Sequence, residues 1–373
     1  MSDVPHLRFP EFSGEWEKYT IGDLCEEFKS GKNIKAESIQ EEGVYPVFGG
    51  NGLRGYTDRY NHDGDYVLIG RQGALCGNVR FVTGKTYITE HAIAAKATND
   101  NYTRYLEYLF VRLNLGQFSD QSAQPGLAVN KLLKIETYVP SKAEQLKIAF
   151  LLRLLDERIA TQNKIIEDLK KLKSAISKQA FAQKPNGWNR LDTLFSKGKA
   201  GGTPTSTNKE YYNGEIPFLS INDITKQGKY VRYTENHLSR SGLENSSAWV
   251  VPEYSLIISM YASVGLVTIN EVPITTSQAM FAMQLRDKDL LDYLYYYLSY
   301  FKYRHIHKYL ETGTQSNINA DIVRGIMIPT YGHSRNMKIA STLQGIDAKI
   351  DNELSVLKLF NRQKNYLLSQ MFI

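Results

Sequence analysis

The line that decides the architecture of this chain occurs twice: it is KIAFLLRLLDERI at 147–159 and, 191 positions later, KIASTLQGIDAKI at 338–350. Around both copies, apolar residues recur with alternating steps of four and three residues, which is the spacing of a heptad seam. The first seam comprises Ile148, Leu152, Leu155, Ile159, Ile166, Leu169, Ile176 and Ala180. The second comprises Ile339, Leu343, Ile346, Ile350, Leu357, Phe360, Leu367 and Met371. The sequence therefore predicts two long helices of the same design.

Each seam has two polar positions, and these bear on how the helices pair. They are Gln162 and Lys173 in the first copy and Glu353 and Lys364 in the second. Parallel pairing in register would bury Lys173 against Lys364, which is unfavourable because two like charges would be desolvated together. Antiparallel pairing in which partner numbers sum to 526 places Lys173 opposite Glu353 and Gln162 opposite Lys364. We therefore predict an antiparallel coiled coil within the chain, with pairing between two chains as the alternative.

The regions that precede the two helices also correspond. The stretch GEWEKYTIGDL at 14–24 resembles NGWNRLDTLF at 186–195, and YVLIGRQGALCGNV at 66–79 parallels LIISMYASVGLV at 256–267. In each case an aromatic helical stretch follows, and the prolines at 140, 185 and 329 mark the junctions.

The expected fold class is thus α+β, with two β-rich modules in a pseudo-two-fold arrangement, joined by two long helices that form an antiparallel coiled coil. The modules are expected at 1–140 and 185–331, and the helices at 141–184 and 332–373. Such helices would hold two module surfaces in inverted orientation at a set distance, as a ruler does.

Charge and cysteine content narrow the class of protein. The net charge of the chain is +6, and the basic excess lies in the helical segments, with +5 for 141–184 and +3 for 332–373. Basic helices of this kind follow a phosphate backbone or carry solvated lysines, and charge alone leaves both interpretations open. Only Cys25 and Cys76 are present, without the spacing of a zinc site, and no stretch has the length and apolarity to span a bilayer. We expect a cytoplasmic protein without a membrane partner.

The sequence predicts no enzyme. Adenine methylation would need an Asn-Pro-Pro-aromatic sequence motif, and the chain has no Pro-Pro. The GKT at 84–86 fails as a phosphate loop because Val79 stands where a glycine is required. The HIH at 305–307 lacks a third metal ligand nearby in sequence. We expect no catalytic residue, metal or cofactor on this chain.

What remains is recognition by polar loops of the modules. Arg54 and Arg71 are suited to guanine, while Gln72, Asn222 and Gln278 are suited to adenine. The candidate phosphate contacts are Lys85, Lys226 and Lys229. Further candidate DNA contacts are Ser259, Tyr261 and Ser263, from a glycine-flanked loop. The competing interpretation of each is an ordinary surface polar residue, or packing for the tyrosine.

Taken together, these stretches resemble the DNA-specificity subunit of type I restriction-modification systems. The resemblance covers essentially the whole chain and includes VPHLRFPEFSGEW at 4–16, YPVFGGNGLRGY at 45–56, EQLKIAFLLRLLDERI at 144–159 and LLSQMFI at 367–373. It implies that each module is a target-recognition domain for one half of a split DNA sequence, and that the paired helices set the unread gap. One departure is NMKIA at 336–340, which replaces the Glu-Gln of the first copy.

The resemblance also implies partners for the chain. These are double-stranded DNA, two modification subunits that methylate adenine with S-adenosylmethionine, and restriction subunits that use ATP and Mg²⁺ to translocate and cut DNA. Two other functions fit the same pattern, namely a coiled-coil scaffold that binds only proteins and an orphan bipartite DNA-binding protein. Exchange of one module between relatives separates DNA recognition from scaffolding, and capture of a methyltransferase separates it from the orphan function.

Overall fold

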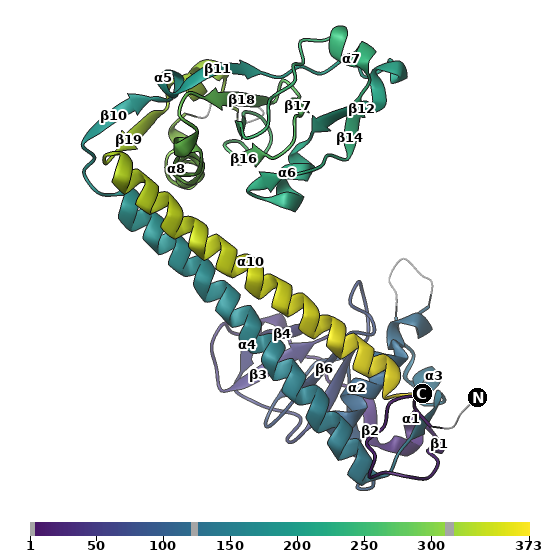
Figure 1. Cartoon of the computed structure of the whole chain (residues 1–373). Helices are drawn as coiled ribbons and strands as arrows, with labels where there is room; N and C mark the ends of the chain where they lie inside the picture. Colours follow the sequence, from purple (N-terminus) through teal and green to yellow (C-terminus); the bar gives the residue numbers. More distant parts are fainter. Residues whose placement is uncertain (1–3, 121–125, 310–316) are drawn as a thin grey trace. The chain divides into compact units, whose positions relative to one another are not determined.

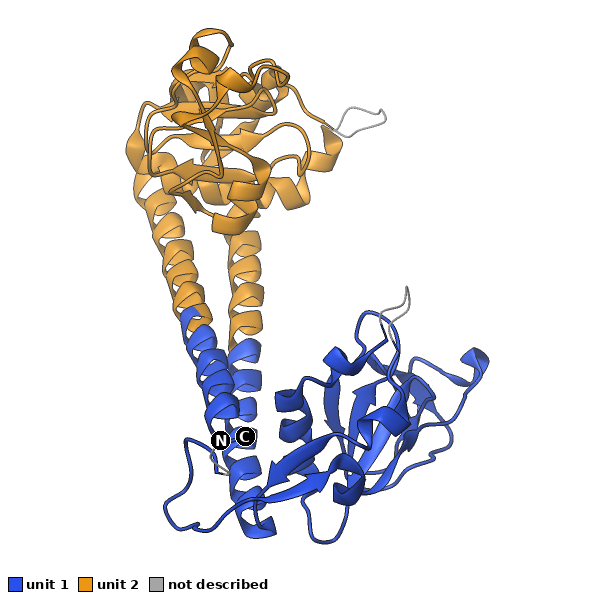
Figure 2. Ribbon diagram, turned by 90° about the vertical axis from the view of Figure 1, so that its right-hand side faces the viewer, with its two compact units in different colours: residues 1–164, 355–373 blue, residues 165–354 orange. Residues whose placement is uncertain are grey.

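The computed structural model describes residues 4–120, 126–309 and 317–373 of the chain (Figure 1). These form two compact units (Figure 2). Unit 1 comprises residues 1–164 and 355–373, and unit 2 comprises residues 165–354. Each unit contains one β-rich module together with one segment of each long helix. The predicted α+β class is confirmed.

The described part of the module of unit 1 contains three small sheets. Strand β1 (Glu17–Thr20) pairs antiparallel with β9 (Glu136–Val139). A four-stranded sheet has the order β2 (Cys25–Ser30), β8 (Ala92–Ala97), β5 (Tyr66–Gly70) and β6 (Val79–Val82). A three-stranded sheet has the order β4 (Gly52–Thr57), β3 (Tyr45–Gly49) and β7 (Tyr87–Ile88), with β7 parallel to β3.

Among the described residues of the module, the α-helices that accompany these sheets are α1 (Ile21–Leu24), α2 (Thr103–Leu113) and α3 (Val129–Leu132). Helix α1 begins at a capping box, because the Thr20 side chain accepts from the Asp23 N–H while the Asp23 carboxylate accepts from the Thr20 N–H. Helix α2 is the aromatic stretch of the sequence, and it buries Tyr105 and Phe110 in the core of the unit. This helix therefore lies between the sheet and the long helices.

The module of unit 2 repeats this order. Strand β10 (Gly187–Arg190) pairs antiparallel with β19 (Met327–Thr330). A five-stranded sheet has the order β11 (Phe195–Ala200), β18 (Met280–Leu285), β15 (Leu256–Ser259), β16 (Val267–Asn270) and β13 (Tyr230–Val231). A three-stranded sheet has the order β14 (Asn236–Leu238), β12 (Tyr212–Leu219) and β17 (Thr275–Thr276).

The helices of this module are α5 (Leu191–Leu194), α6 (Ile221–Gln227), α7 (Arg240–Glu244), α8 (Leu291–Arg304) and α9 (Ala320–Gly325). Helix α8 corresponds to α2 and buries Tyr293, Tyr297 and Phe301 in the core of unit 2. Helices α6 and α7 have no counterpart in the described part of unit 1. The two modules therefore share a scaffold and differ in an insertion.

The long helices are α4 (Lys142–Phe181) and α10 (His333–Gln370). All predicted seam positions are buried or half-buried, which confirms the heptad assignment. Within unit 1, Ile148 and Leu152 of α4 share a core with Leu368 of α10. Within unit 2, Phe181 and Leu343 do the same. Because low numbers on one helix meet high numbers on the other, the predicted antiparallel pairing is confirmed.

The predicted partners of the seam lysines were wrong. Glu353 was expected opposite Lys173 and Gln162 opposite Lys364, but the ion pairs that these lysines form are with Asp347 and Asp156, each at 2.5 Å between Nζ and Oδ1. Partner numbers in these pairs sum to 520 rather than 526. Both aspartates flank the seam and are partly exposed, so that a long lysine side chain reaches them with less desolvation than a pair inside the seam would require.

No helix in the described part of the chain has the length and apolar character that would let it cross a membrane.

Candidate nucleic-acid interface

Several loops of unit 1 meet at one end of its sheets, which we call the loop end of unit 1: residues 49–52, 70–78 and 89–91. Strand pairing fixes this, because β3 and β7 are parallel and both end here, as does β5. The Arg71 N–H donates to the His91 carbonyl and the Leu127 N–H donates to the Arg71 carbonyl, both at 2.9 Å. These backbone bonds hold the Arg71 loop beside the turn that precedes β8.

The loops at this end approach one another closely. A Cβ on Gly50 would lie 2.7 Å from the His91 carbonyl oxygen, so that only glycine fits at this position. Gln72 is exposed, and its side-chain oxygen lies 3.3 Å from Nδ1 of His91. Arg54, on β4, is exposed beside Gly49. The structure thus brings together Arg54, Arg71 and Gln72, which were candidates on sequence alone.

Sequence reasoning missed two residues at the loop end of unit 1. Arg80 of β6 is exposed, and a Cβ on Gly52 would lie 3.1 Å from its guanidinium group. His91 is exposed and its Nε2 lies 3.3 Å from the Glu90 carboxylate. Neither lies in a glycine-rich loop, and only strand pairing, which is not visible in the sequence, reveals their position.

Lys85 is not part of this group. It follows β6, whose end at Val82 pairs with Tyr66 at the start of β5, whereas the Arg71 loop follows the opposite end of that strand pair. Its ammonium group lies 4.9 Å from the centroid of the Tyr60 ring. Lys85 is exposed and is available to a phosphate, but at another part of the module.

The corresponding loop end of unit 2 comprises residues 220–222, 260–266 and 277–279. The Met260 N–H donates to the Ala279 carbonyl at 2.7 Å, as Arg71 does to His91 in unit 1. Tyr261 is 41% exposed, and Gln278 is exposed and accepts a hydrogen bond from the Thr203 hydroxyl. Strands β12 and β17 are parallel and both end here, which brings the start of α6 to the same end.

The Tyr261 loop has an unusual backbone. Ala262 and Ser263 both have φ of +40°, in the left-handed region that non-glycine residues seldom adopt. Backbone strain of this kind concentrates at functional sites. The Ser263 side chain is exposed at the tip of this loop.

Helix α6 presents two further candidates. It begins at a capping box formed by Ser220 and Asp223. The Asn222 amide donates to the Glu235 carboxylate at 3.1 Å, and Lys226 forms an ion pair with the same carboxylate. Asn222 and Lys226 are exposed but already share an acidic partner, so a DNA contact by either would compete with Glu235.

Two candidates have structural roles instead. Ser259 is fully buried, where its hydroxyl donates to the Ser263 carbonyl at 2.8 Å and accepts from the Leu266 N–H at 2.9 Å. Lys229 pairs with Asp292 at 2.5 Å and lies 4.5 Å from the centroid of the Tyr296 ring. Ser259 shapes the loop and Lys229 ties β13 to α8, so neither side chain is presented to a ligand.

A cluster of Lys, Asp and Tyr joins each module to its long-helix segments, and it occurs once in each unit. In unit 2, the Tyr296 hydroxyl donates to Asp347 at 2.8 Å, and Lys173, paired with the same carboxylate, lies 5.3 Å from the Tyr296 ring centroid. Burial, and next the Asp347 charge, raises the pKa of Tyr296, so the hydroxyl remains a donor.

The same cluster in unit 1 comprises Tyr108, Asp156 and Lys364. The Tyr108 hydroxyl donates to Asp156 at 2.8 Å, and Lys364 lies 5.7 Å from the Tyr108 ring centroid. Burial, and next the Asp156 charge, raises the pKa of Tyr108. The sequence held a signal for this cluster, because both copies of the repeated line have aspartate at the same position.

The residues just before the two copies of the repeated line differ, and they form different contacts with the modules. Glu144 is buried and accepts two hydrogen bonds from the Arg8 guanidinium group, at 2.8 Å each, while Gln145 accepts from the Tyr102 N–H. In the second copy Asn336 accepts from the Tyr331 N–H at 3.0 Å. Because the second copy lacks the Glu-Gln pair, different segments of the chain are hydrogen-bonded to the starts of α4 and α10.

Within the described residues, no group of three or more His, Cys, Asp or Glu side chains is placed to hold a metal ion.

Comparison with known proteins finds a family match in both halves of the chain. A family model described as "Type I restriction modification DNA specificity domain" matches residues 13–171 and 185–358. The chain is 38% identical over 178 residues to the type I restriction enzyme EcoprrI specificity subunit of Escherichia coli, covering 47% of this chain and 43% of the relative. It is 25% identical over 178 residues to the MjaIX specificity subunit of Methanocaldococcus jannaschii, covering 46% and 40%. The matched stretches thus span less than half of these curated relatives.

Solved structures extend the likeness of fold to the whole chain. The crystal structure of a type-I restriction-modification system S subunit from M. genitalium aligns with a TM-score of 0.69 at 18% identity, covering 99% of both chains. A structure concerned with complex assembly and conformational transition of the type I R-M system aligns with a TM-score of 0.60 at 15% identity, covering 97% and 98%. The predicted family resemblance is confirmed.

Proposed function

We propose, from the premise that the chain belongs to the family of type I restriction modification DNA specificity domains, that it is the DNA-recognition subunit of a type I restriction-modification complex. In this proposal residues 1–140 and 185–331 are two target-recognition domains, each for one half of a split target. Residues 141–184 and 332–373 are the spacer helices between them. The observation that carries the proposal is the duplicated module, which has polar loops gathered at the same end of its sheets in both units.

The proposed base contacts are polar side chains at the two loop ends. In unit 1 they are the half-buried Arg71 and the exposed Arg54 and Gln72, joined by the exposed Arg80 and His91. In unit 2 they are Asn222, Tyr261, Ser263 and Gln278. Lys85 and Lys226 remain proposed phosphate contacts, whereas Ser259 and Lys229 are left out because their side chains are used inside the module.

In this proposal the chain determines which DNA sequence the complex recognises and carries out no catalysis itself. We propose two modification subunits as partners, which flip an adenine out of the duplex and methylate it with S-adenosylmethionine. Restriction subunits that use ATP and Mg²⁺ would be further partners. All of these cofactors would bind to the partners, and the complex would act on DNA in the cytoplasm.

Methylation mapping tests the proposal. The chain is expressed together with the modification subunit encoded beside it, and N6-methyladenine is mapped across the host DNA by single-molecule sequencing. A single split motif with one methylated adenine in each half is expected. Exchange of residues 185–331 for the module of a relative should change one half of that motif and leave the other unchanged. A stable complex that methylates no defined motif, or a motif unaffected by the exchange, would contradict the proposal.

A further inference from the structure

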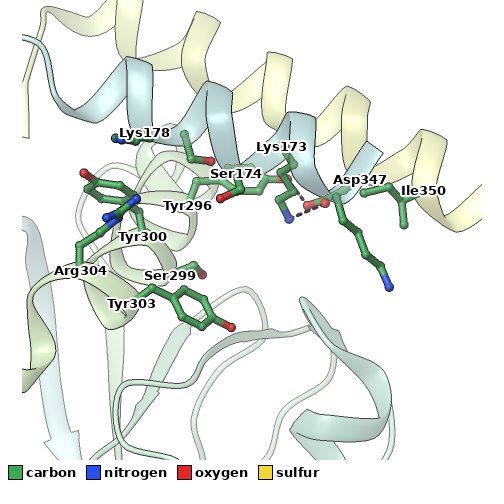
Figure 3. Close-up of a pocket in the computed structure, with 12 residues that line it drawn as sticks. Lys173, Ser174, Lys178, Tyr296, Ser299, Tyr300, Tyr303, Arg304, Asp347 and Ile350 are labelled. Carbon is green, nitrogen blue, oxygen red and sulfur yellow. Dashed lines mark hydrogen bonds and ion pairs between the residues drawn. The ribbon is translucent and has the colours of Figure 1, made fainter. Parts of the chain in front are cut away.

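A cavity of about 360 Å³ lies within unit 2, between α8 and the unit 2 segments of the long helices (Figure 3). Side chains from α4 and α8 face each other across it. Its polar lining on α4 comprises Lys170, Lys173, Ser174, Ser177 and Lys178. Its lining on α8 comprises Tyr296, Ser299, Tyr300, Tyr303 and Arg304. Among the described residues of the lining, the only carboxylate is Asp347 of α10.

The charges around this cavity are not balanced. Asp347 is engaged by Lys173 and by the Tyr296 hydroxyl. Among the described residues, Lys170, Lys178 and Arg304 have no ion-pair partner. Three cations therefore surround one cavity without a counter-charge, an arrangement that attracts an anion.

The lining also supplies hydrogen-bond donors. The hydroxyl groups of Ser174, Ser177, Tyr300 and Tyr303 have no hydrogen-bond partner within the described part of the chain. The Tyr303 side chain is 80% exposed. Lysine, arginine, serine and tyrosine side chains are the groups that bind the phosphate oxygens of nucleic acids.

Comparison of corresponding positions in the two units distinguishes the residues of this cavity that serve packing from those that are available for binding. The Lys-Asp-Tyr cluster is present in both units, as expected for a structural contact. The three unpaired cations are not repeated: Asn361, Ser369 and Gly116 stand in unit 1 where Lys170, Lys178 and Arg304 stand in unit 2. Attachment of a module to the long helices therefore does not require these cations, and another role is left for them.

We propose that this cavity binds a phosphodiester group of the DNA backbone, giving unit 2 a contact that does not depend on base sequence. The proposal rests on the proposed function, because it assumes that the chain meets a duplex. A phosphate in the cavity gains charge-assisted contacts from the cations that it reaches and hydrogen bonds from hydroxyl groups of the lining. Such a contact adds affinity equally to target and non-target DNA.

The test compares the complex of the full chain and its modification subunits with its Lys170→Gln/Lys178→Gln/Arg304→Gln variant. Binding to a labelled target duplex and to a scrambled duplex is measured over a range of salt concentrations. Loss of one phosphate contact should make the slope of log K against log salt shallower by about 0.9, which weakens binding about five-fold near 0.15 M salt. Both duplexes should be affected alike, and the methylated motif should stay the same.

Lys171→Gln is the matched control, because Lys171 is adjacent to Lys170 on α4 but pairs with Glu167 and does not line the cavity. Salt slopes of the triple variant equal to those of this control would overturn the proposal. Loss of modification subunits from the triple variant, with an unchanged salt slope for complexes that still assemble, would also overturn it and assign the cavity to a protein surface. Absence of a methylated motif with the wild-type chain is a different result, which refutes the proposed function itself.

Discussion

At the scale of single residues, the direction of a side chain decides whether a polar loop residue recognises a ligand or shapes the loop. The sequence places Ser259 and Ser263 in the same loop with the same chemistry. In the structure Ser259 is fully buried and binds the backbone of its own loop, while Ser263 is exposed. Residue type and loop membership were predictable, whereas direction depends on the backbone twist at Ala262 and Ser263, which only the folded loop reveals.

Ser259→Ala should destabilise unit 2 by about 1 kcal/mol, because the Ser259 hydroxyl loses its hydrogen bonds to the Ser263 carbonyl and from the Leu266 N–H, while that N–H still donates to the Ser263 carbonyl. Ser263→Ala should change stability by less than about 0.5 kcal/mol, since only the backbone carbonyl of that residue is used and Ala262 already adopts the same φ. Thermal denaturation of both variants checks this. Equal melting temperatures for the two variants would refute the structural role of Ser259.

At the scale of elements, the periodicity of the sequence predicted which helix positions are buried, but it did not predict which residues pair with the seam lysines. The 3.5-residue spacing located the buried or half-buried seam positions of α4 and α10, although the last of them, Met371, lies just after α10 ends at Gln370, because burial of one stripe repeats along a helix. The partners of Lys173 and Lys364 could not be predicted from the seam alone. The carboxylates that bind them flank the seam and are also held by a tyrosine of α2 or α8, a third element that a two-helix argument leaves out.

The Lys-Asp-Tyr clusters should therefore stabilise the attachment of each module. Tyr108→Phe removes a half-buried hydrogen bond to a charged carboxylate, and should lower the free energy of unfolding of unit 1 by about 1–3 kcal/mol. Tyr366→Phe is the control, since Tyr366 lies exposed on α10 in the same unit. Chemical denaturation of the two variants makes the comparison. Should Tyr108→Phe unfold at the same denaturant concentration as the control, the cluster would have no stabilising role.

At the scale of the whole molecule, the repeat predicted two modules but not how they differ. Strand β11 follows β2 by 170 positions, whereas β15 follows β5 by 190, so about 20 residues are added in unit 2. Helices α6 and α7 lie in this added stretch, and α6 carries Asn222 and Lys226. Under the proposed function, each module needs loops of its own to recognise its own DNA sequence. The repeat predicts the shared scaffold and is least informative where the modules diverge.

Charge sets how tightly the chain alone can hold DNA. The first module, residues 1–140, carries a net charge of −3, and the whole chain carries only +6. Because affinity rises with the number of phosphates that are neutralised, we expect the isolated chain to bind its target weakly and with strong salt dependence. Binding should become much tighter once the proposed modification subunits enclose the duplex. Fluorescence anisotropy of a labelled target, with and without these subunits, measures the difference, and nanomolar binding by the isolated chain at physiological salt would contradict the expectation.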